Sequence, residues 1–185
     1  MALLTRRDFN KHGLAALATM IGTLSFGTRA NSPEKKITPL ILDTDIGDDI
    51  DDTWALMMLL RTKEISTKLI TTGFGNTRYR TRLLAKLLNR IGRADIPVGI
   101  GLDPTDNTGN QSEWLGDFDL GKDSSLIHED GVQAIIDTIK QSPEPVTLLG
   151  IGPAMNIAEA LRRDPSIAKN ARFVGMHGSI RKGYD

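Results

Sequence analysis

Residues 37–52 decide the fold class and read ITPLILDTDIGDDIDD. The apolar run at 37–42 stops abruptly at Asp43, and this pattern predicts a short buried strand. Six of the ten residues in 43–52 are aspartate. The sequence therefore places a dense group of carboxylates directly after the first predicted strand.

Predicted strands and helices alternate along the rest of the chain. Residues 101–127 show no clear period and predict a long loop of the kind that usually has a function. This order of elements predicts an α/β fold with a doubly wound, mostly parallel, Rossmann-like sheet. Apolar or β-branched runs predict strands at 65–72, 96–100, 146–151 and 172–176, and helical spacing of apolar residues predicts helices at 52–61, 77–91, 130–141 and 154–163.

Polar clusters follow four of the predicted strands. These clusters are 43–52, Asn76, 150–156 and 177–178. In a doubly wound sheet, ligands bind at the carboxyl ends of the strands. We therefore expect these separate segments to meet in one crevice.

The composition describes one folded domain and excludes several kinds of chemistry. The chain has 185 residues, of which 39% are hydrophobic, and this is enough for one packed core. Its 23 basic and 23 acidic side chains balance, and only 5% of the residues are aromatic, so we expect no nucleic-acid partner. The absence of cysteine excludes thiolate catalysis, disulfide bonds and cysteine-ligated metals.

The N-terminal residues resemble an export signal. Arg6, Arg7 and Lys11 precede an uncharged stretch at 13–27, and Ala30 offers a small-residue cleavage site. The paired arginines are similar to those of a twin-arginine signal. The uncharged stretch is too short and too rich in Gly and Thr for a stable membrane anchor. We therefore expect a periplasmic or secreted protein, and an ordinary amphipathic helix is the alternative. The expected divisions are an export signal at 1–30, a linker at 31–36 and a domain at 37–185.

The aspartate cluster predicts a bound cation. Neighbouring carboxylates repel one another, and a cation relieves this repulsion. Oxygen ligands favour Ca²⁺ or Mg²⁺. An EF-hand is excluded, because position 12 counted from Asp43 is Trp54 instead of a bidentate Glu. The alternatives are a solvated loop that caps the following helix and a phosphate-transferring Asp-x-Asp site, although no nearby Lys or Gly-rich segment supports phosphate binding.

Three segments resemble the inosine–uridine-preferring nucleoside hydrolase family. They read DTDIGDDIDDTWAL at 43–56, TTGFGN at 71–76 and GIGPAMNIA at 150–158. The first is similar to a family variant with a slightly longer aspartate loop, in which Asp48 and Asp49 are extra and have no assigned role. Three motifs in order, each at a predicted strand end, make the resemblance specific, and it covers most of residues 37–178.

The resemblance implies a calcium site. Asp45 and Asp52 match the carboxylates that bind the family's calcium ion. Met155 falls where the family usually has Thr, which binds the ion through its backbone carbonyl. Because a backbone ligand does not depend on the side chain, Met155 is compatible with the site. Asp43 matches an acid that lies just behind the metal ligands.

The resemblance also implies the chemistry of the site. Asp51 matches the acid that activates the attacking water, Asn76 matches an amide that helps to hold the ribose, and Asn156 is predicted to bind substrate. Hydrolysis of an N-glycosidic bond passes through an oxocarbenium-like state, so it needs a base, a positioned water and a grip on the sugar hydroxyls. His177 departs from the family's usual Met-Gly-Gly and is a candidate for protonating the leaving base.

The resemblance implies more chain than the 185 residues given. Family members are roughly twice as long as this domain, so we expect the chain to be the N-terminal portion of the fold, truncated at its C-terminus. Two functions stay open. One is calcium-dependent hydrolysis of nucleosides or related ribosides, and the other is a non-catalytic, exported metal- and sugar-binding module or inactive homologue. The expected partner is a small nucleoside or riboside, and a homo-oligomer also stays open.

Overall fold

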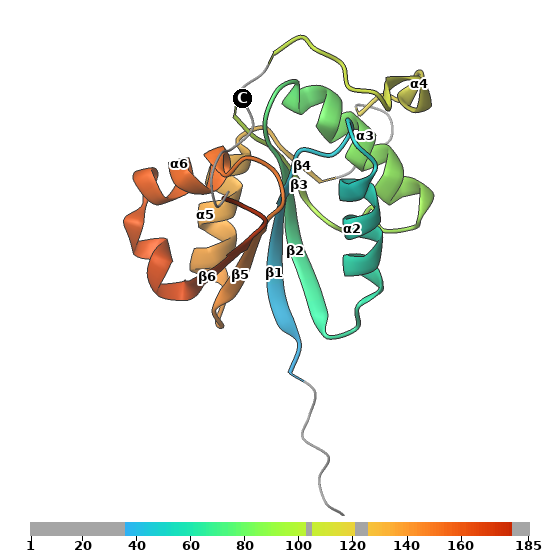
Figure 1. The fold of residues 1–185 in the computed structure, drawn as a ribbon. Coiled ribbons are helices and arrows are strands. Elements are labelled where there is room, and N and C mark those ends of the chain that lie inside the picture. The colour runs from blue at the N-terminus through green and yellow to red at the C-terminus, as the bar shows by residue number, and fades with distance from the viewer. Residues whose placement is uncertain (1–35, 103–104, 121–125, 179–185) are drawn as a thin grey trace, which may run out of the picture. The chain divides into compact units, whose positions relative to one another are not determined.

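The computed structural model describes residues 36–102, 105–120 and 126–178 (Figure 1). The predicted export signal at 1–30 lies outside these ranges, and so does the predicted linker apart from Lys36. Within the described residues, no helix is both long enough and apolar enough to cross a membrane.

A parallel sheet forms the centre of the domain, with the strand order β4-β3-β2-β1-β5-β6. From β1 the chain builds outward through β2, β3 and β4, and it then returns to place β5 on the other side of β1. The predicted doubly wound α/β fold is confirmed. The strands are β1 (Thr38–Thr44), β2 (Ile65–Thr72), β3 (Val98–Ile100), β4 (Ile127–His128), β5 (Val146–Gly150) and β6 (Ala171–Gly175).

Helices cover both faces of the sheet. Figure 1 shows α2 (Asp51–Arg61) and α3 (Thr77–Arg90) on one face, and α5 (Gly131–Gln141) and α6 (Met155–Arg163) on the other. Two shorter elements are the helix α4 (Ser112–Leu115) and the 3-10 helix η1 (Pro165–Asn170).

The strand β1 contributes to two separate apolar cores. Leu40 and Leu42 belong to the cluster that includes the buried side chains of α2 and α3. Ile41 points the other way and belongs to the cluster with α5 and α6. A strand that is buried on both faces is apolar at consecutive positions, and this explains the unbroken run that precedes Asp43.

Apart from small shifts of element ends and the unpredicted η1, the observed elements differ from the predicted ones mainly at two places. The strand predicted at 37–42 continues to Thr44, because Asp43 still pairs with β2 and β5. Asp43 therefore lies inside a strand and not in the loop that follows it. The segment predicted as a loop at 101–127 contains α4 and ends at β4, and both elements are too short to show a period in the sequence.

Candidate functional site

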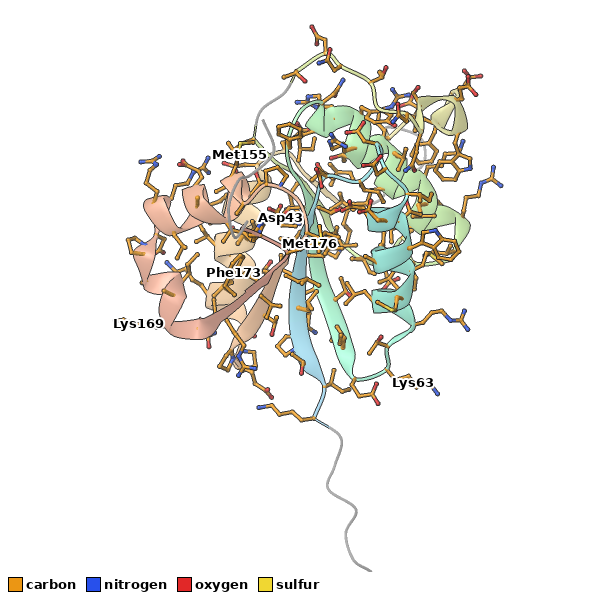
Figure 2. All side chains as sticks on the ribbon, in the orientation of Figure 1. Asp43, Lys63, Met155, Lys169, Phe173 and Met176 are labelled. Carbon is orange, nitrogen blue, oxygen red and sulfur yellow. The ribbon has the colours of Figure 1, made fainter. Side chains whose placement is uncertain are left out.

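The carboxyl ends of several strands converge where the winding of the chain reverses. Asp43 of β1 is level with Thr71 of β2 and Gly150 of β5. Beyond the strands, the Ile151 amide donates to the Asp43 carbonyl at 2.9 Å, and the Met176 amide donates to the Gly150 carbonyl at 3.0 Å. Figure 2 labels Asp43 and Met155 at this end of the sheet. The structure thus brings together the polar segments that follow β1, β2, β5 and β6, at the position where ligands bind in this fold.

Asp43 is a buried carboxylate at the centre of this region. Its side chain is 1% exposed, and its Oδ1 accepts hydrogen bonds from the Thr71 hydroxyl at 2.6 Å and from Asn156 Nδ2 at 2.7 Å. Burial raises the pKa of Asp43 to about 6, although these two hydrogen bonds act in the opposite direction. Asp43 is inaccessible to solvent, so it suits an acid that holds neighbouring groups in place from the buried side of the site.

Asn156 holds four segments of the chain together. The residue is fully buried, and its Nδ2 donates both to Asp43 and to the Thr72 carbonyl, the latter at 3.1 Å. Its Oδ1 accepts from the Leu102 amide at 2.8 Å. The side-chain amide therefore has its two hydrogens and its oxygen engaged inside the protein. The predicted substrate-binding role of Asn156 stays a prediction, and the structure places the side chain in a buried network.

Asp45 and Asp52 are half-buried carboxylates that repel each other. Burial raises the pKa of Asp52 to about 6, opposed by a hydrogen bond from the Thr44 hydroxyl and reinforced by the negative charges of Asp45 and Asp51. Burial also raises the pKa of Asp45, and the positive charge of Arg80 partly offsets this effect. A cation between these carboxylates would relieve both the repulsion and the cost of burial.

The loop after β5 approaches Asp45 closely. A Cβ atom placed on Gly152 would stand 2.6 Å from Oδ1 of Asp45 and 2.8 Å from its backbone nitrogen, so any larger residue would displace the carboxylate. Met155 begins α6 three residues later and is half-buried. Its predicted use of a backbone carbonyl as a metal ligand stays a prediction.

The donor set suits a metal ion that takes few carboxylates. Among the described residues, no group of three or more His, Asp or Glu side chains lies close enough together to hold an ion. Asp45 and Asp52 nevertheless supply two half-buried carboxylates, and the loop after β5 brings backbone groups beside Asp45. Ca²⁺ accepts carbonyl oxygens and water as well as carboxylates. The residues therefore fit a calcium ion that takes two carboxylates from this chain and completes its shell with other oxygens.

Asp51 lies at the start of α2 and is exposed to solvent. Its Oδ1 accepts a hydrogen bond from the Asp52 amide at 3.1 Å. The helix dipole favours a carboxylate at this end. Because Asp51 is exposed and directly precedes Asp52, it can meet a water molecule beside the predicted cation, as a general base requires.

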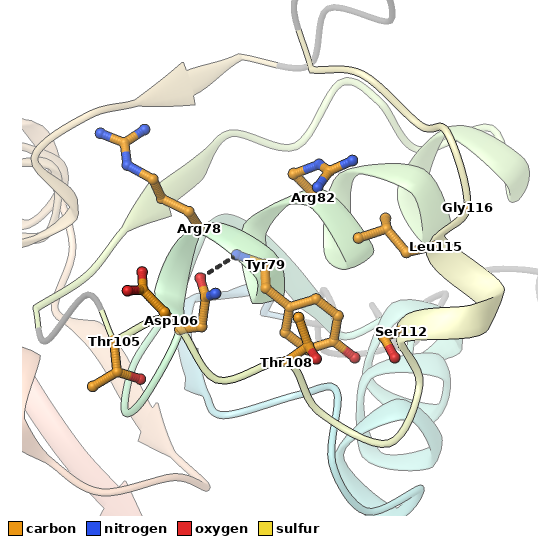
Figure 3. A pocket seen from close by; sticks show the side chains of 10 residues that line it. Arg78, Tyr79, Arg82, Thr105, Asp106, Thr108, Ser112, Leu115 and Gly116 are labelled. Carbon is orange, nitrogen blue, oxygen red and sulfur yellow. Dashed lines mark hydrogen bonds between the residues drawn. The ribbon is translucent and has the colours of Figure 1, made fainter.

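Asn76 caps α3 and borders a pocket. Its Oδ1 accepts from the Tyr79 amide at 2.9 Å, the bond dashed in Figure 3. The pocket measures about 520 Å³ and lies between the start of α3 and the segment 105–116. Among the residues that the structure describes, the amide nitrogen of Asn76 has no hydrogen-bond partner. The predicted contact of Asn76 with the ribose stays a prediction.

His177 lies beside the carboxyl ends of β5 and β6. Its ring stacks on Phe173 with centroids 5.4 Å apart and an interplanar angle of 8°. A Cβ atom on Gly150 would stand 3.0 Å from its Nε2. The imidazole thus borders the crevice, and its proposed role toward the leaving base stays a prediction.

Arg80 is a candidate functional residue that the sequence did not single out. It is one of four arginines in α3, yet it is 4% exposed. Its guanidinium binds the backbone of Asp45 and the carboxylate of Asp48. Only the folded position of the loop at 45–50 distinguishes Arg80 from the other arginines of the helix.

Comparisons with known proteins identify the family of the chain. The family model described as inosine-uridine preferring nucleoside hydrolase matches residues 40–184. The chain is 33% identical over 152 residues to the probable uridine nucleosidase 2 of Arabidopsis thaliana, covering 75% of this chain and 46% of that protein. It is 34% identical over 156 residues to the pyrimidine-specific ribonucleoside hydrolase of Salmonella arizonae, covering 78% and 50%.

Solved structures give the same result. A plant nucleoside hydrolase superposes with a TM-score of 0.65 at 25% identity, covering 77% of this chain and 48% of the plant protein. The purine-preferring ribonucleoside hydrolase of Gardnerella vaginalis superposes with a TM-score of 0.62 at 27% identity, covering 77% and 49%. The chain thus spans about half the length of the relatives that it matches. The family model covers residues 40–184, which is more than half of the chain. The chain therefore belongs to the inosine-uridine preferring nucleoside hydrolase family.

Proposed function

We propose that this chain contributes to calcium-dependent hydrolysis of the N-glycosidic bond of a ribonucleoside or a related riboside. The observation that carries the proposal is the meeting of Asp45, Asp52 and the loop after β5 where the winding of the sheet reverses. The named relatives are nucleosidases and ribonucleoside hydrolases. Since the chain covers about half of each relative, the activity and the substrate remain proposals for this chain.

The proposed calcium ligands of this chain are Asp45, Asp52 and the backbone carbonyl of Met155. When bound, the ion would orient a water molecule and lower its pKa. The half-buried position of Asp45 and Asp52 supports this assignment, because partial exclusion of water strengthens their attraction for a cation. Asp43 and the Thr71 hydroxyl would support these ligands from the buried side.

The proposed catalytic base is Asp51. Its exposed carboxylate would accept a proton from the attacking water within hydrogen-bond distance. Asn76 would use its amide nitrogen to hold a ribose hydroxyl, because its oxygen already caps α3. Attack by a single water on the side opposite to the leaving nucleobase would invert the anomeric carbon.

We further propose that the whole protein is exported through the twin-arginine-like signal at 1–30, followed by the linker at 31–36 and the hydrolase domain at 37–185. The order of positive charges, uncharged stretch and small residues in the sequence supports this proposal. A second copy of the chain is a further proposed partner, and a nucleic acid or a stable membrane anchor is not expected.

The decisive experiment measures ribose release from uridine and from inosine with calcium present. Replacement Asp51→Ala is expected to lower the rate by about 10²- to 10⁴-fold, because the attacking water loses its base. Asp49→Ala is the matched control, since it removes an exposed carboxylate two positions earlier in the chain. Equal rates for Asp51→Ala and the wild type would remove Asp51 as the base. Calcium binding without turnover by the wild type would favour the non-catalytic metal- and sugar-binding module.

A further inference from the structure

Arg80 extends from α3 into the aspartate loop, which we define as residues 45–50. Its side chain is 5% exposed, although arginine is among the residue types that are least often buried. Burying a guanidinium is strongly unfavourable unless its charge is paired and its N–H groups are bonded. The contacts of Arg80 should therefore explain why the fold retains it there.

All three nitrogens of the Arg80 guanidinium bind protein groups. Nε donates to the Phe74 carbonyl at 2.6 Å, which ties the loop after β2 to the same centre. Nη1 donates to the backbone carbonyls of Asp45 and Ile46, the latter at 3.0 Å. Nη2 donates to Oδ2 of Asp48 at 2.7 Å. The guanidinium thus fixes two consecutive peptide groups of the aspartate loop together with one of its carboxylates.

These contacts fix the proposed metal ligand Asp45 from both sides. Arg80 binds its backbone carbonyl, and the closely packed Gly152 limits its side chain. A carboxylate held in this way loses little further freedom when it binds an ion, so its affinity is higher than that of a mobile carboxylate.

Asp48 is the residue of the aspartate loop whose carboxylate pairs with Arg80. Neighbouring contacts hold the same part of the loop, because the Tyr79 hydroxyl and the Gln111 amide both donate to the Gly47 carbonyl, at 2.9 and 3.1 Å. Asp48 thus supplies a counter-charge for the buried arginine from within the loop.

We propose that Arg80 and Asp48 form a positioning pair that holds the aspartate loop in the geometry for cation binding. The inference rests on the proposed calcium site and deepens it. A lysine cannot replace Arg80, because one ammonium group cannot reach three carbonyls and a carboxylate in the planar arrangement of a guanidinium. Neither member of the pair touches the substrate in this assignment.

Calorimetric titration of chelator-treated protein with Ca²⁺ tests the pair. Arg80→Lys keeps the charge and is expected to weaken calcium affinity by about 10- to 100-fold, the usual effect of losing a residue that orients a metal ligand. Arg82→Lys is the matched control, because Arg82 lies two positions along the same helix and donates to the Phe118 carbonyl, outside the aspartate loop. It is expected to leave the affinity within about threefold.

Asp48→Asn keeps the test decisive even where Arg80→Lys lowers the yield of folded protein. Its matched control is Asp49→Asn, which removes the same charge from the same loop but from a side chain without a bond to Arg80. Asp48→Asn is expected to weaken calcium affinity more than Asp49→Asn does. The double variant Arg80→Lys with Asp48→Asn is expected to bind no more weakly than Arg80→Lys alone, because each change breaks the same contact.

Three results would overturn the pair. They are a folded Arg80→Lys protein with wild-type affinity, an equal effect of Asp48→Asn and Asp49→Asn, and an equal effect of Arg82→Lys and Arg80→Lys. Each of these leaves calcium binding by the wild type, and the proposed function, intact. A wild-type chain that does not bind calcium would instead overturn the proposed metal site together with the pair.

Discussion

At the scale of single residues, the aspartates of the site differ in their access to water. Asp51 is exposed, Asp45 and Asp52 are half-buried, and Asp43 is closed off. The pKa values of Asp43 and Asp52 are raised to about 6, mainly by burial. Ionising these groups therefore costs free energy in the metal-free protein, and the same cost makes a cation a favourable partner.

This cost predicts how the stability of the metal-free protein depends on pH. Between the ordinary aspartate pKa of 3.8 and the folded-state value of about 6, the folded Asp52 binds more protons than the unfolded one. The free energy of unfolding therefore falls as the pH rises through this window, and the loss is complete above it. Asp52→Asn removes the loss while keeping an acceptor for the Thr44 hydroxyl.

In calcium-free buffer at pH 7.5, Asp52→Asn is expected to be more stable than the wild type by about 1–2 kcal/mol, allowing for solvent screening. The difference should vanish below about pH 3, where the wild-type carboxylate is protonated in both the folded and the unfolded state. Urea unfolding at the two pH values measures this. The control is Asp137→Asn at an exposed position of α5, and it should change stability by less than about 0.5 kcal/mol. An Asp52→Asn protein no more stable than the wild type at pH 7.5 would contradict the explanation.

At the scale of elements, Asn156 couples α6 to the strand ends. Its amide joins Asp43 of β1, Thr72 of β2 and Leu102 after β3. Asn156→Ala leaves a buried carboxylate, a carbonyl and an amide with fewer partners, and is expected to lower the free energy of unfolding by about 2–4 kcal/mol. Urea unfolding measures the loss. The exposed Asn110→Ala is the control, and an equally small effect of both changes would contradict the coupling role.

The bounds of the elements also show how much of the fold the sequence predicts. The β2 strand was predicted at its observed bounds, because β-branched residues end sharply at a glycine. Asp43 was assigned to a loop, because its charge ends the apolar run although its backbone still pairs with two strands. Neither α4 nor β4 was predicted, because four and two residues are too few for a period.

The sequence predicts less of the candidate site than of the fold. Motifs identify the aspartates and both asparagines, because carboxylates and amides next to strand ends form a recognisable pattern. They do not identify Arg80, which follows Arg78 and precedes Arg82 in a helix where all three look alike. Its burial arises from contacts with the aspartate loop more than thirty residues away, and no local pattern encodes a contact of that range.

At the scale of the whole molecule, the proposed calcium ligands come from segments far apart in the sequence. Asp45 follows β1, Asp52 belongs to α2, and Met155 begins α6, so an ion bound by all three would connect the two helical layers across the sheet. Unfolding separates these segments, and a ligand that binds only the folded state stabilises it. Calcium should therefore raise the stability of the domain as a whole.

Calcium at about 100 times its dissociation constant is expected to stabilise the wild type by about 2.7 kcal/mol, which corresponds to about 5–10 °C in melting temperature. A chelator should reverse the shift. Asp45→Asn should abolish it, because one of the two proposed carboxylate ligands is lost, whereas the exposed Asp117→Asn should retain it. Scanning calorimetry with and without calcium measures each shift. Equal melting temperatures of the wild type in calcium and in chelator would contradict a site that spans the sheet, because an ion held by both layers must leave when they separate.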